Sequence, residues 1–135
     1  SGTGENDAFN RLVVTNGLSP REVVLFRAWF RYLRQTGLSY GLLTVVDALR
    51  RAPAVARGII DLFDARHNPD NCFEGAAEAA LATIETGLSG VQAADDDRIL
   101  RLIRGVVMAT LRTNAFSPAA AEALAFKLDS AAVPN

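Results

Sequence analysis

One stretch of this sequence predicts a helix with both ends defined. Ser19 occupies the N-cap position, Pro20 the first helical position, and Glu22 stands three residues after Ser19, where it can complete a capping box. Gly37 supplies the left-handed residue that commonly ends a helix. Between these ends, apolar residues recur at spacings of three and four and share one side: Val23, Phe26, Trp29, Phe30 and Leu33. That side carries the only Trp of the chain, so we expect other helices to cover it and predict an all-α fold.

Length and composition are those of one folded domain with no electrostatic specialisation. The chain has 135 residues, half of them hydrophobic, and a formal net charge of −1, so a single core is expected and no strong field invites nucleic acid or anionic lipid. The one cysteine, Cys72, excludes an internal disulfide and fits a reducing compartment. No apolar run approaches the length of a membrane span, and no export leader is visible. We therefore expect a cytoplasmic protein with no membrane partner, and the start without Met leads us to expect a piece of a longer chain.

Apolar periodicity and helix breakers divide the sequence into six or seven helices with short links, packed as an irregular bundle. We expect residues 1–6 to be flexible and Asp7 to cap the first helix. The predicted helices span residues 8–16, 20–36, 40–51, 53–66, an Ala-rich segment of uncertain ends within 70–91, 96–113, and a last turn that begins at Ser117-Pro118.

Two features qualify the C-terminal part of this prediction. The 96–113 helix opens on three carboxylates, Asp95 to Asp97, which suit a helix N-terminus, and its predicted apolar stripe runs as far as Leu111. Residues 124–128 alternate apolar residues with small or polar ones, so an extended segment is possible there. The fold prediction is therefore all-α with a possible extended C-terminal segment.

No group of residues in the sequence predicts catalysis or metal binding. His67 and Cys72 can each bind zinc, but a structural site needs four ligands and the chain has no other His or Cys, so we interpret them as a surface histidine and a half-buried thiol. Asp61 with Asp64, and Asp95 to Asp97, are interpreted as a solvated helix face and a helix N-terminal cluster. Neither a Gly-x-Ser-x-Gly nucleophile motif nor a Gly-rich phosphate loop occurs. We expect no catalytic, cofactor-binding or metal-binding residue.

A row of arginines forms the one candidate interaction face. Arg27, Arg31 and Arg34 recur at helical spacing beside Trp29, Phe30 and Tyr32. Arginines among aromatic residues are typical of single-strand nucleic-acid binders. The acidic overall charge and the position of the aromatic residues on a core stripe favour a different interpretation, a polar face that meets carboxylates of a neighbouring domain.

An ordered set of peptides resembles one protein family. In chain order these are Ala-Phe-Asn-Arg-Leu-Val at 8–13, Gly-Leu-Ser-Pro-Arg-Glu at 17–22, Arg-Ala at 27–28, Arg-Tyr-Leu-Arg-Gln at 31–35, residues 60–66, Asn-Pro at 68–69, Asp-Arg-Ile-Leu at 97–100, Ala-Thr-Leu-Arg-Thr-Asn at 109–114 and Phe-Lys-Leu-Asp at 126–129. Together they resemble the large-subunit bacterial NAD-dependent glutamate dehydrogenases, over most of the chain from about Asp7 to Asn135. The match is weakest within residues 71–94, where a variable insertion is plausible.

The resemblance implies a place in a larger enzyme. In that family the corresponding stretch is a helical region that precedes the dehydrogenase domain, and the peptide at 124–129 leads into the catalytic part. The family's substrate-binding lysines and glycine-rich nucleotide loop would lie beyond Asn135. We therefore expect a flexible remnant at 1–6, a helical domain at 7–116 and a leading segment at 117–135, with the catalytic domain absent.

The parent implied by the resemblance is a cytoplasmic homo-oligomer that deaminates L-glutamate to 2-oxoglutarate and ammonia with reduction of NAD. NAD would belong to the parent, while this segment would hold no cofactor and be inactive alone, with the neighbouring domains as its partners. The alternative is a stand-alone helical module that docks a protein through the arginine row. Nucleic-acid binding is the remaining hypothesis, and it is not the one that we adopt.

Overall fold

Six helices and one small β-hairpin make up the fold in the computed structural model, which describes residues 3–129 and 131–133, and side chains from Ala8 onward. The helices are α1 (Thr3–Asn16), α2 (Pro20–Gln35), α3 (Leu42–Arg51), α4 (Pro53–His67), α5 (Ala76–Ser89) and α6 (Ala94–Ala109). The hairpin pairs β1 (Thr110–Thr113) with β2 (Phe126–Leu128), and a short 3-10 helix, Pro118–Ala121, lies between the two strands. The predicted helical bundle with an extended C-terminal segment is therefore confirmed.

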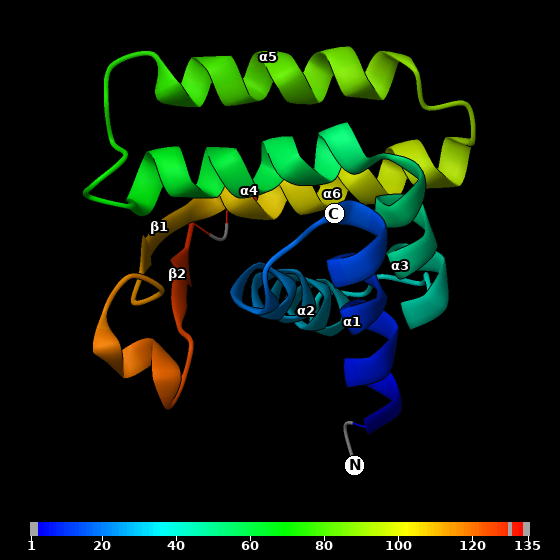
Figure 1. The fold of residues 1–135 in the computed structure, drawn as a ribbon, viewed down its shortest axis with the longest axis horizontal. Helices are drawn as coiled ribbons and strands as arrows, with labels where there is room; N and C mark the ends of the chain where they lie inside the picture. Colours follow the sequence, from blue (N-terminus) through cyan, green and yellow to red (C-terminus); the bar gives the residue numbers. More distant parts are fainter. Residues whose placement is uncertain (1–2, 130, 134–135) are drawn as a thin grey trace.

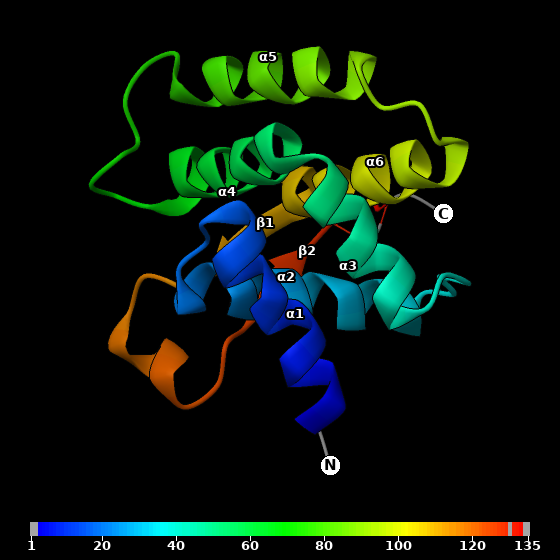
Figure 2. The ribbon, with the colours of Figure 1, turned by 45° about the vertical axis from the view of Figure 1, so that its right-hand side comes forward.

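The helices form two groups on opposite sides of α4. Figure 1 shows α5 above α4, with α6 alongside α4, while α1, α2 and α3 lie below them. The turned view of Figure 2 keeps this order, so α5 is separated from α1 to α3 by α4 and α6. The hairpin lies at one end of the bundle, beside α2.

Helix α2 has the ends that the sequence predicts. The Ser19 hydroxyl accepts a hydrogen bond from the Glu22 backbone N–H at 3.2 Å, and the Glu22 carboxylate accepts one from the Ser19 N–H at 2.9 Å. This is the capping box. Gly37 adopts the left-handed conformation, with φ at +108°, just beyond the helix. All five apolar residues of the predicted stripe are buried, with Trp29 fully enclosed.

Helices α4 and α5 approach closely because glycines lie in their interface. A Cβ at Gly58 of α4 would meet Ile84 Cγ1 at 2.8 Å, and one at Gly87 of α5 would meet Val55 Cγ2 at 2.6 Å. Both distances are too short for carbon atoms in van der Waals contact. The interface therefore depends on the missing side chains at these two positions.

The end of α6 corrects the sequence prediction. The helix was expected to continue to Thr113, but it stops at Ala109, and residues 110–113 form a strand instead. The buried Thr110 hydroxyl donates to the Val106 carbonyl at 2.9 Å, and the Asp129 N–H donates to the Ala109 carbonyl at 2.8 Å. Pairing with β2 thus replaces the last helical turn. A register irregularity between Thr110 and Arg112 leaves Leu111 exposed, contrary to its predicted place in the apolar stripe.

Other boundaries differ by smaller amounts. Helix α1 begins at Thr3 and so covers most of the stretch expected to be flexible, of which Ser1 and Gly2 lie outside the described residues. Helix α3 begins two residues after the predicted Tyr40. The predicted start of α4 at Pro53 is confirmed. Proline is tolerated in the first helical position because the N–H that it lacks would have no partner in the helix.

Candidate functional site

Four aromatic residues from distant parts of the chain meet where the hairpin packs on the helices. Trp29 of α2 lies 5.3 Å from Phe63 of α4 and 6.4 Å from Phe126 of β2, measured between ring centroids. Phe63 also lies 5.7 Å from Phe116, in the loop between the strands, and 5.9 Å from Phe126. We call these four residues the aromatic junction. Such ring pairs contribute more to stability than the burial of their surface area alone. The junction therefore holds the hairpin against both helices.

Arg21, in the first turn of α2, contacts the loop between the two strands of the hairpin. Its Nη2 donates to the Ala115 carbonyl at 2.5 Å, and its guanidinium carbon lies 4.5 Å from the centre of the Phe116 ring. A cation over an aromatic face is attracted by the ring quadrupole. The same helix end therefore holds both the backbone and a side chain of the loop.

A second charged contact ties the start of α2 to α4. Arg57 donates to both carboxylate oxygens of Glu22, at 2.8 and 3.0 Å. Burial alone would raise the pKa of Glu22, but the hydrogen bonds from Arg57 and from the Ser19 backbone outweigh it, so the pKa lies below its ordinary value. Glu22 thus serves the capping box and an ion pair between two helices at once.

The structure reverses our interpretation of His67 and Cys72. Cys72 is exposed, and its Sγ donates to the Ala65 carbonyl at 3.1 Å. His67 is the half-buried one: its ring lies 5.0 Å from that of Phe63, and its Nε2 is buried with no hydrogen-bond partner in the part of the chain that is described. Burial lowers the pKa of His67, and the nearby Arg66 lowers it further. Among the described residues, no group of three or more His, Cys, Asp or Glu is placed to hold a metal ion.

The carboxylates at the start of α6 do more than complement its dipole. Asp96 is buried and accepts from Arg51 Nε and Nη2 at 2.8 and 2.9 Å, which lowers its pKa. Asp97 pairs with Arg101 at 2.9 Å, and Asp95 accepts from the Tyr40 hydroxyl at 2.9 Å. The predicted position of these carboxylates in the first turn is confirmed. Nothing local in the sequence indicates the Arg51 contact, because its partner is 45 residues away.

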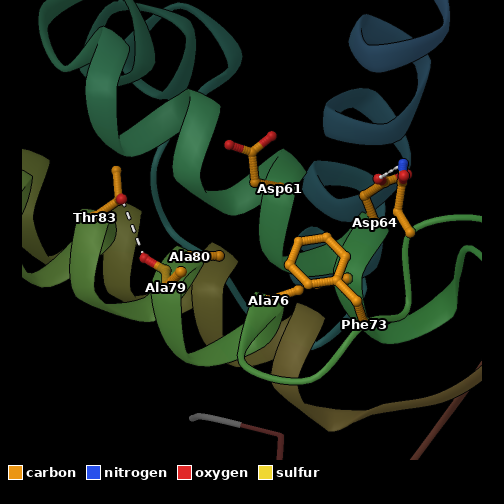
Figure 3. A pocket seen from close by; sticks show the side chains of 9 residues that line it. Asp61, Asp64, Phe73, Ala76, Ala79, Ala80 and Thr83 are labelled. Carbon is orange, nitrogen blue, oxygen red and sulfur yellow. Dashed lines mark hydrogen bonds between the residues drawn. The ribbon is translucent and has the colours of Figure 1, made fainter.

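Asp61 and Asp64 line a pocket of about 290 Å³ between α4, α5 and the loop that joins them, which we call the α4–α5 pocket. Ala76, Ala79 and Ala80 of α5 form its small apolar wall. Figure 3 shows the Phe73 ring beside Ala76, and in this view the Asp61 carboxylate lies apart from the ring, with its oxygens directed away from it.

Asp64 is fixed inside this pocket by hydrogen bonds from Asn68 Nδ2 at 2.9 Å and Asn71 Nδ2 at 2.5 Å. Within the described ranges, Asp61 accepts no hydrogen bond and forms no ion pair, and partial burial raises its pKa. Asp61 is exposed and Asp64 half-buried, so the interpretation of this pair as a solvated helix face is confirmed for Asp61 only.

The arginine row divides between two environments. Arg27 and Arg31 line a groove of about 340 Å³ between α2 and the C-terminal segment, together with Leu124 and Phe126. Arg34 instead lies 5.6 Å from the centre of the Phe30 ring. Of the aromatic residues beside this row, Trp29 and Phe30 are buried in the core, where they cannot stack on nucleic-acid bases.

We examined the helices for a segment that could span a membrane. None of those in the described ranges combines the length and apolar character that a bilayer span requires.

Comparison with known proteins identifies two consecutive regions in the chain. Residues 4–69 match the family described as glutamate dehydrogenase, helical motif 3. Residues 83–135 match the family described as bacterial NAD-glutamate dehydrogenase, catalytic domain. The catalytic match begins earlier than the leading segment that we placed at 117–135, so the expectation that the catalytic domain is wholly absent is corrected. Whether 7–116 and 117–135 behave as separate units stays a prediction.

Curated relatives agree with both matches. The chain is 38% identical to the NAD-specific glutamate dehydrogenase of Mycobacterium tuberculosis over 96% of its own length and 8% of that protein. It is 40% identical to the Pseudomonas aeruginosa protein of the same name over 87% of the chain and 8% of that protein. It is 36% identical to the Halomonas elongata protein of that name over 98% of the chain and 9% of that protein.

The chain thus spans less than a tenth of the length of these relatives. Residues 70–82, between the two regional matches, fall almost entirely inside the stretch where the resemblance is weakest. The chain belongs to the bacterial NAD-specific glutamate dehydrogenase family, as a segment that covers helical motif 3 and part of the catalytic domain.

Proposed function

We propose that this segment is a non-catalytic scaffold that holds the helical region of a dehydrogenase against its catalytic domain. The parent enzyme would oxidatively deaminate L-glutamate to 2-oxoglutarate and ammonia while reducing NAD, as the names of the relatives indicate. The segment itself would contribute no group to that reaction. Its role would be to fix the position of the chain that enters the catalytic domain.

One observation carries the proposal: a single hydrophobic core crosses the border between the two matched regions. Trp29 and Phe63 belong to the helical motif 3 match, whereas Phe116 and Phe126 belong to the catalytic match, and all four meet in the aromatic junction. Arg21 crosses the same border through its hydrogen bond to Ala115. Protein cores are close-packed and transmit strain, so a change on one side of this border displaces the other.

The charged residues of the segment also support a structural role. Glu22 and Asp96 each accept hydrogen bonds from two guanidinium nitrogens of one arginine, and each contact joins two helices. Their pKa values lie below the ordinary range, which keeps these carboxylates ionised and paired at neutral pH. A general acid or base would instead need a pKa near the working pH.

The proposal is tested first on the 135-residue chain alone. We expect no glutamate-dependent formation of NADH and no saturable NAD binding, measured by absorbance and by calorimetry. Turnover by this chain, or specific NAD binding, would refute the scaffold role.

The second test uses the complete dehydrogenase. Phe126→Ala removes a ring from the aromatic junction, and Val14→Ala is the matched control, since Val14 is 87% exposed on α1. We expect Phe126→Ala to lower kcat several-fold and leave the KM values for glutamate and NAD unchanged, because the segment positions the catalytic domain without touching substrate. Raised KM values with unchanged kcat would place these residues at a substrate site instead.

The same proposal extends to the assembly of the parent. We infer a cytoplasmic homo-oligomer in which this segment contacts neighbouring domains of its own chain. Light scattering of the complete dehydrogenase tests the oligomeric state, and a monomeric enzyme would contradict this part of the proposal alone.

A further inference from the structure

The α4–α5 pocket combines an unpaired carboxylate with an exposed aromatic ring. Asp61 makes none of the hydrogen bonds or ion pairs found within the described ranges, and Arg57, whose charge acts on it, already donates to both oxygens of Glu22. Phe73 is 69% exposed, which is unusual for a ring of this size. The pocket thus carries unused negative charge and unused apolar surface within one cavity of about 290 Å³.

None of the residues that line the pocket is basic. Asp64 lies on the same side of α4, one turn further on, and adds a second carboxylate. It accepts only neutral amide donors, from Asn68 and Asn71. The pKa of Asp61 is raised by burial, and the nearby Asp64 carboxylate adds to this effect against the opposing influence of Arg57. A cation that entered the pocket would stabilise the ionised form of Asp61.

We propose that the α4–α5 pocket receives an arginine side chain from a part of the dehydrogenase that lies outside these 135 residues. A guanidinium is planar, can donate to both oxygens of Asp61, and stacks on an aromatic face such as that of Phe73. The methylene stem of the arginine would lie along the alanine wall of α5.

Both of these contacts, an arginine over an aromatic ring and an arginine on a carboxylate, occur elsewhere in this chain. Arg21 lies 4.5 Å from the centre of the Phe116 ring, and Arg57 donates to both oxygens of Glu22. A lysine would offer a point charge without the flat surface that stacks on a ring. The pocket therefore fits arginine better than lysine.

The source of the arginine follows from how little of the enzyme this chain represents. The chain covers 8% of its Mycobacterium tuberculosis relative, so the remaining polypeptide supplies most of the surfaces that can face the pocket. Asn71, Phe73, Ala76, Ala79 and Ala80 lie between the two regional matches, so the pocket is built largely from residues outside both family regions. The inference rests on the proposed function only in requiring that the segment is part of the larger enzyme.

Hydrogen exchange on the complete dehydrogenase tests the proposal, with mass-spectrometric readout over residues 70–83. Asp61→Asn removes the charge from a carboxylate with no internal partner, so the fold should be retained. Glu78→Gln is the matched control, because Glu78 is an exposed carboxylate on α5 that does not line the pocket. We expect exchange in this segment to rise by up to about fivefold in Asp61→Asn and to stay unchanged in Glu78→Gln, as loss of a solvent-exposed charge pair implies.

The occupant is identified by photo-crosslinking from p-benzoylphenylalanine placed at position 73 of the complete dehydrogenase. We expect an adduct on an arginine-containing peptide from outside residues 1–135, with a yield that falls in the Asp61→Asn background. An adduct on a peptide without arginine, no adduct outside these residues, or exchange that is equal in Asp61→Asn and the unsubstituted enzyme would each overturn the proposal. Neither readout depends on turnover, so failure here is distinguishable from failure of the scaffold proposal.

Discussion

Adding one methyl group at Gly87 should destabilise the fold, although helix propensity alone predicts the opposite. Alanine is favoured over glycine inside a helix by about 1 kcal/mol. The new Cβ would lie 2.6 Å from Val55 Cγ2, roughly 1 Å inside the optimum for two carbon atoms. Val55 is fully buried and β-branched, so its side chain has one favoured rotamer in a helix and cannot turn away. Helix α5 must therefore move away from α4.

Overpacking of this kind costs about 1–3 kcal/mol. After the propensity gain is subtracted, Gly87→Ala should lower the free energy of unfolding by about 1 kcal/mol. Gly58→Ala should behave similarly but more mildly, because its Cβ meets Ile84 Cγ1 at the longer distance of 2.8 Å. The double variant should cost less than the sum of the two, since a displaced α5 accommodates both methyl groups.

Urea unfolding followed by Trp29 fluorescence measures these effects, because the chain has one Trp and it is fully buried. Gly90→Ala is the control on the same helix end: its Cβ would meet only the Gly87 carbonyl, at an ordinary 3.6 Å, so a change within about 0.5 kcal/mol is expected. If Gly87→Ala were more stable than the unsubstituted chain, the close approach of α4 and α5 would not be the limiting contact, and the reasoning would fail.

Three further predictions concern the charged and titrating groups. Arg21→Gln should destabilise the hairpin by about 1 kcal/mol, because it removes the hydrogen bond to Ala115 and the contact with the Phe116 ring. Faster amide exchange in residues 110–128 would show this loss. Arg50→Gln is the neutral control, because the ion pair of Arg50 is exposed to solvent. Asp96→Asn should lower the free energy of unfolding by about 1–2 kcal/mol at neutral pH. This difference from the unsubstituted chain should shrink as pH falls below the ordinary Asp value of 3.8, where the unfolded chain takes up a proton first, and should vanish only below the folded pKa, which Arg51 lowers. His67 is the only histidine, and its folded pKa lies below 6.5. The unfolded chain therefore takes up a proton first, and the free energy of unfolding should fall as pH drops through 6.5. His67→Leu should abolish this pH dependence between pH 7.5 and 5.5, and a dependence that persists would belong to another group.

The candidate site was only partly accessible to sequence reasoning. The aromatic residues of α2 could be assigned to a core because their spacing repeats within one helix. Their partners Phe116 and Phe126 could not be assigned, since nothing local indicates that the hairpin returns to α2. The exposures of His67 and Cys72 were predicted in reverse, because burial there depends on how the loop after α4 folds back on the helix.

Features whose causes lie within a few residues can be predicted from the amino-acid sequence. The capping box of α2, the start of α4 at Pro53 and the left-handed Gly37 follow from local backbone chemistry, and each is found where it was predicted. The family resemblance, which depends on an ordered set of short peptides, belongs with them.

The end of α6 and the pairing of the charges depend instead on contacts between distant parts of the chain. Thr110 becomes a strand residue because Leu128 lies beside it, and Arg51 and Arg21 bond to partners 45 and 94 residues away. Local propensities in a helix differ by less than about 1 kcal/mol per ordinary residue. A strand pairing or a buried ion pair between distant residues outweighs that difference, and no periodicity in the sequence indicates which distant residues will meet.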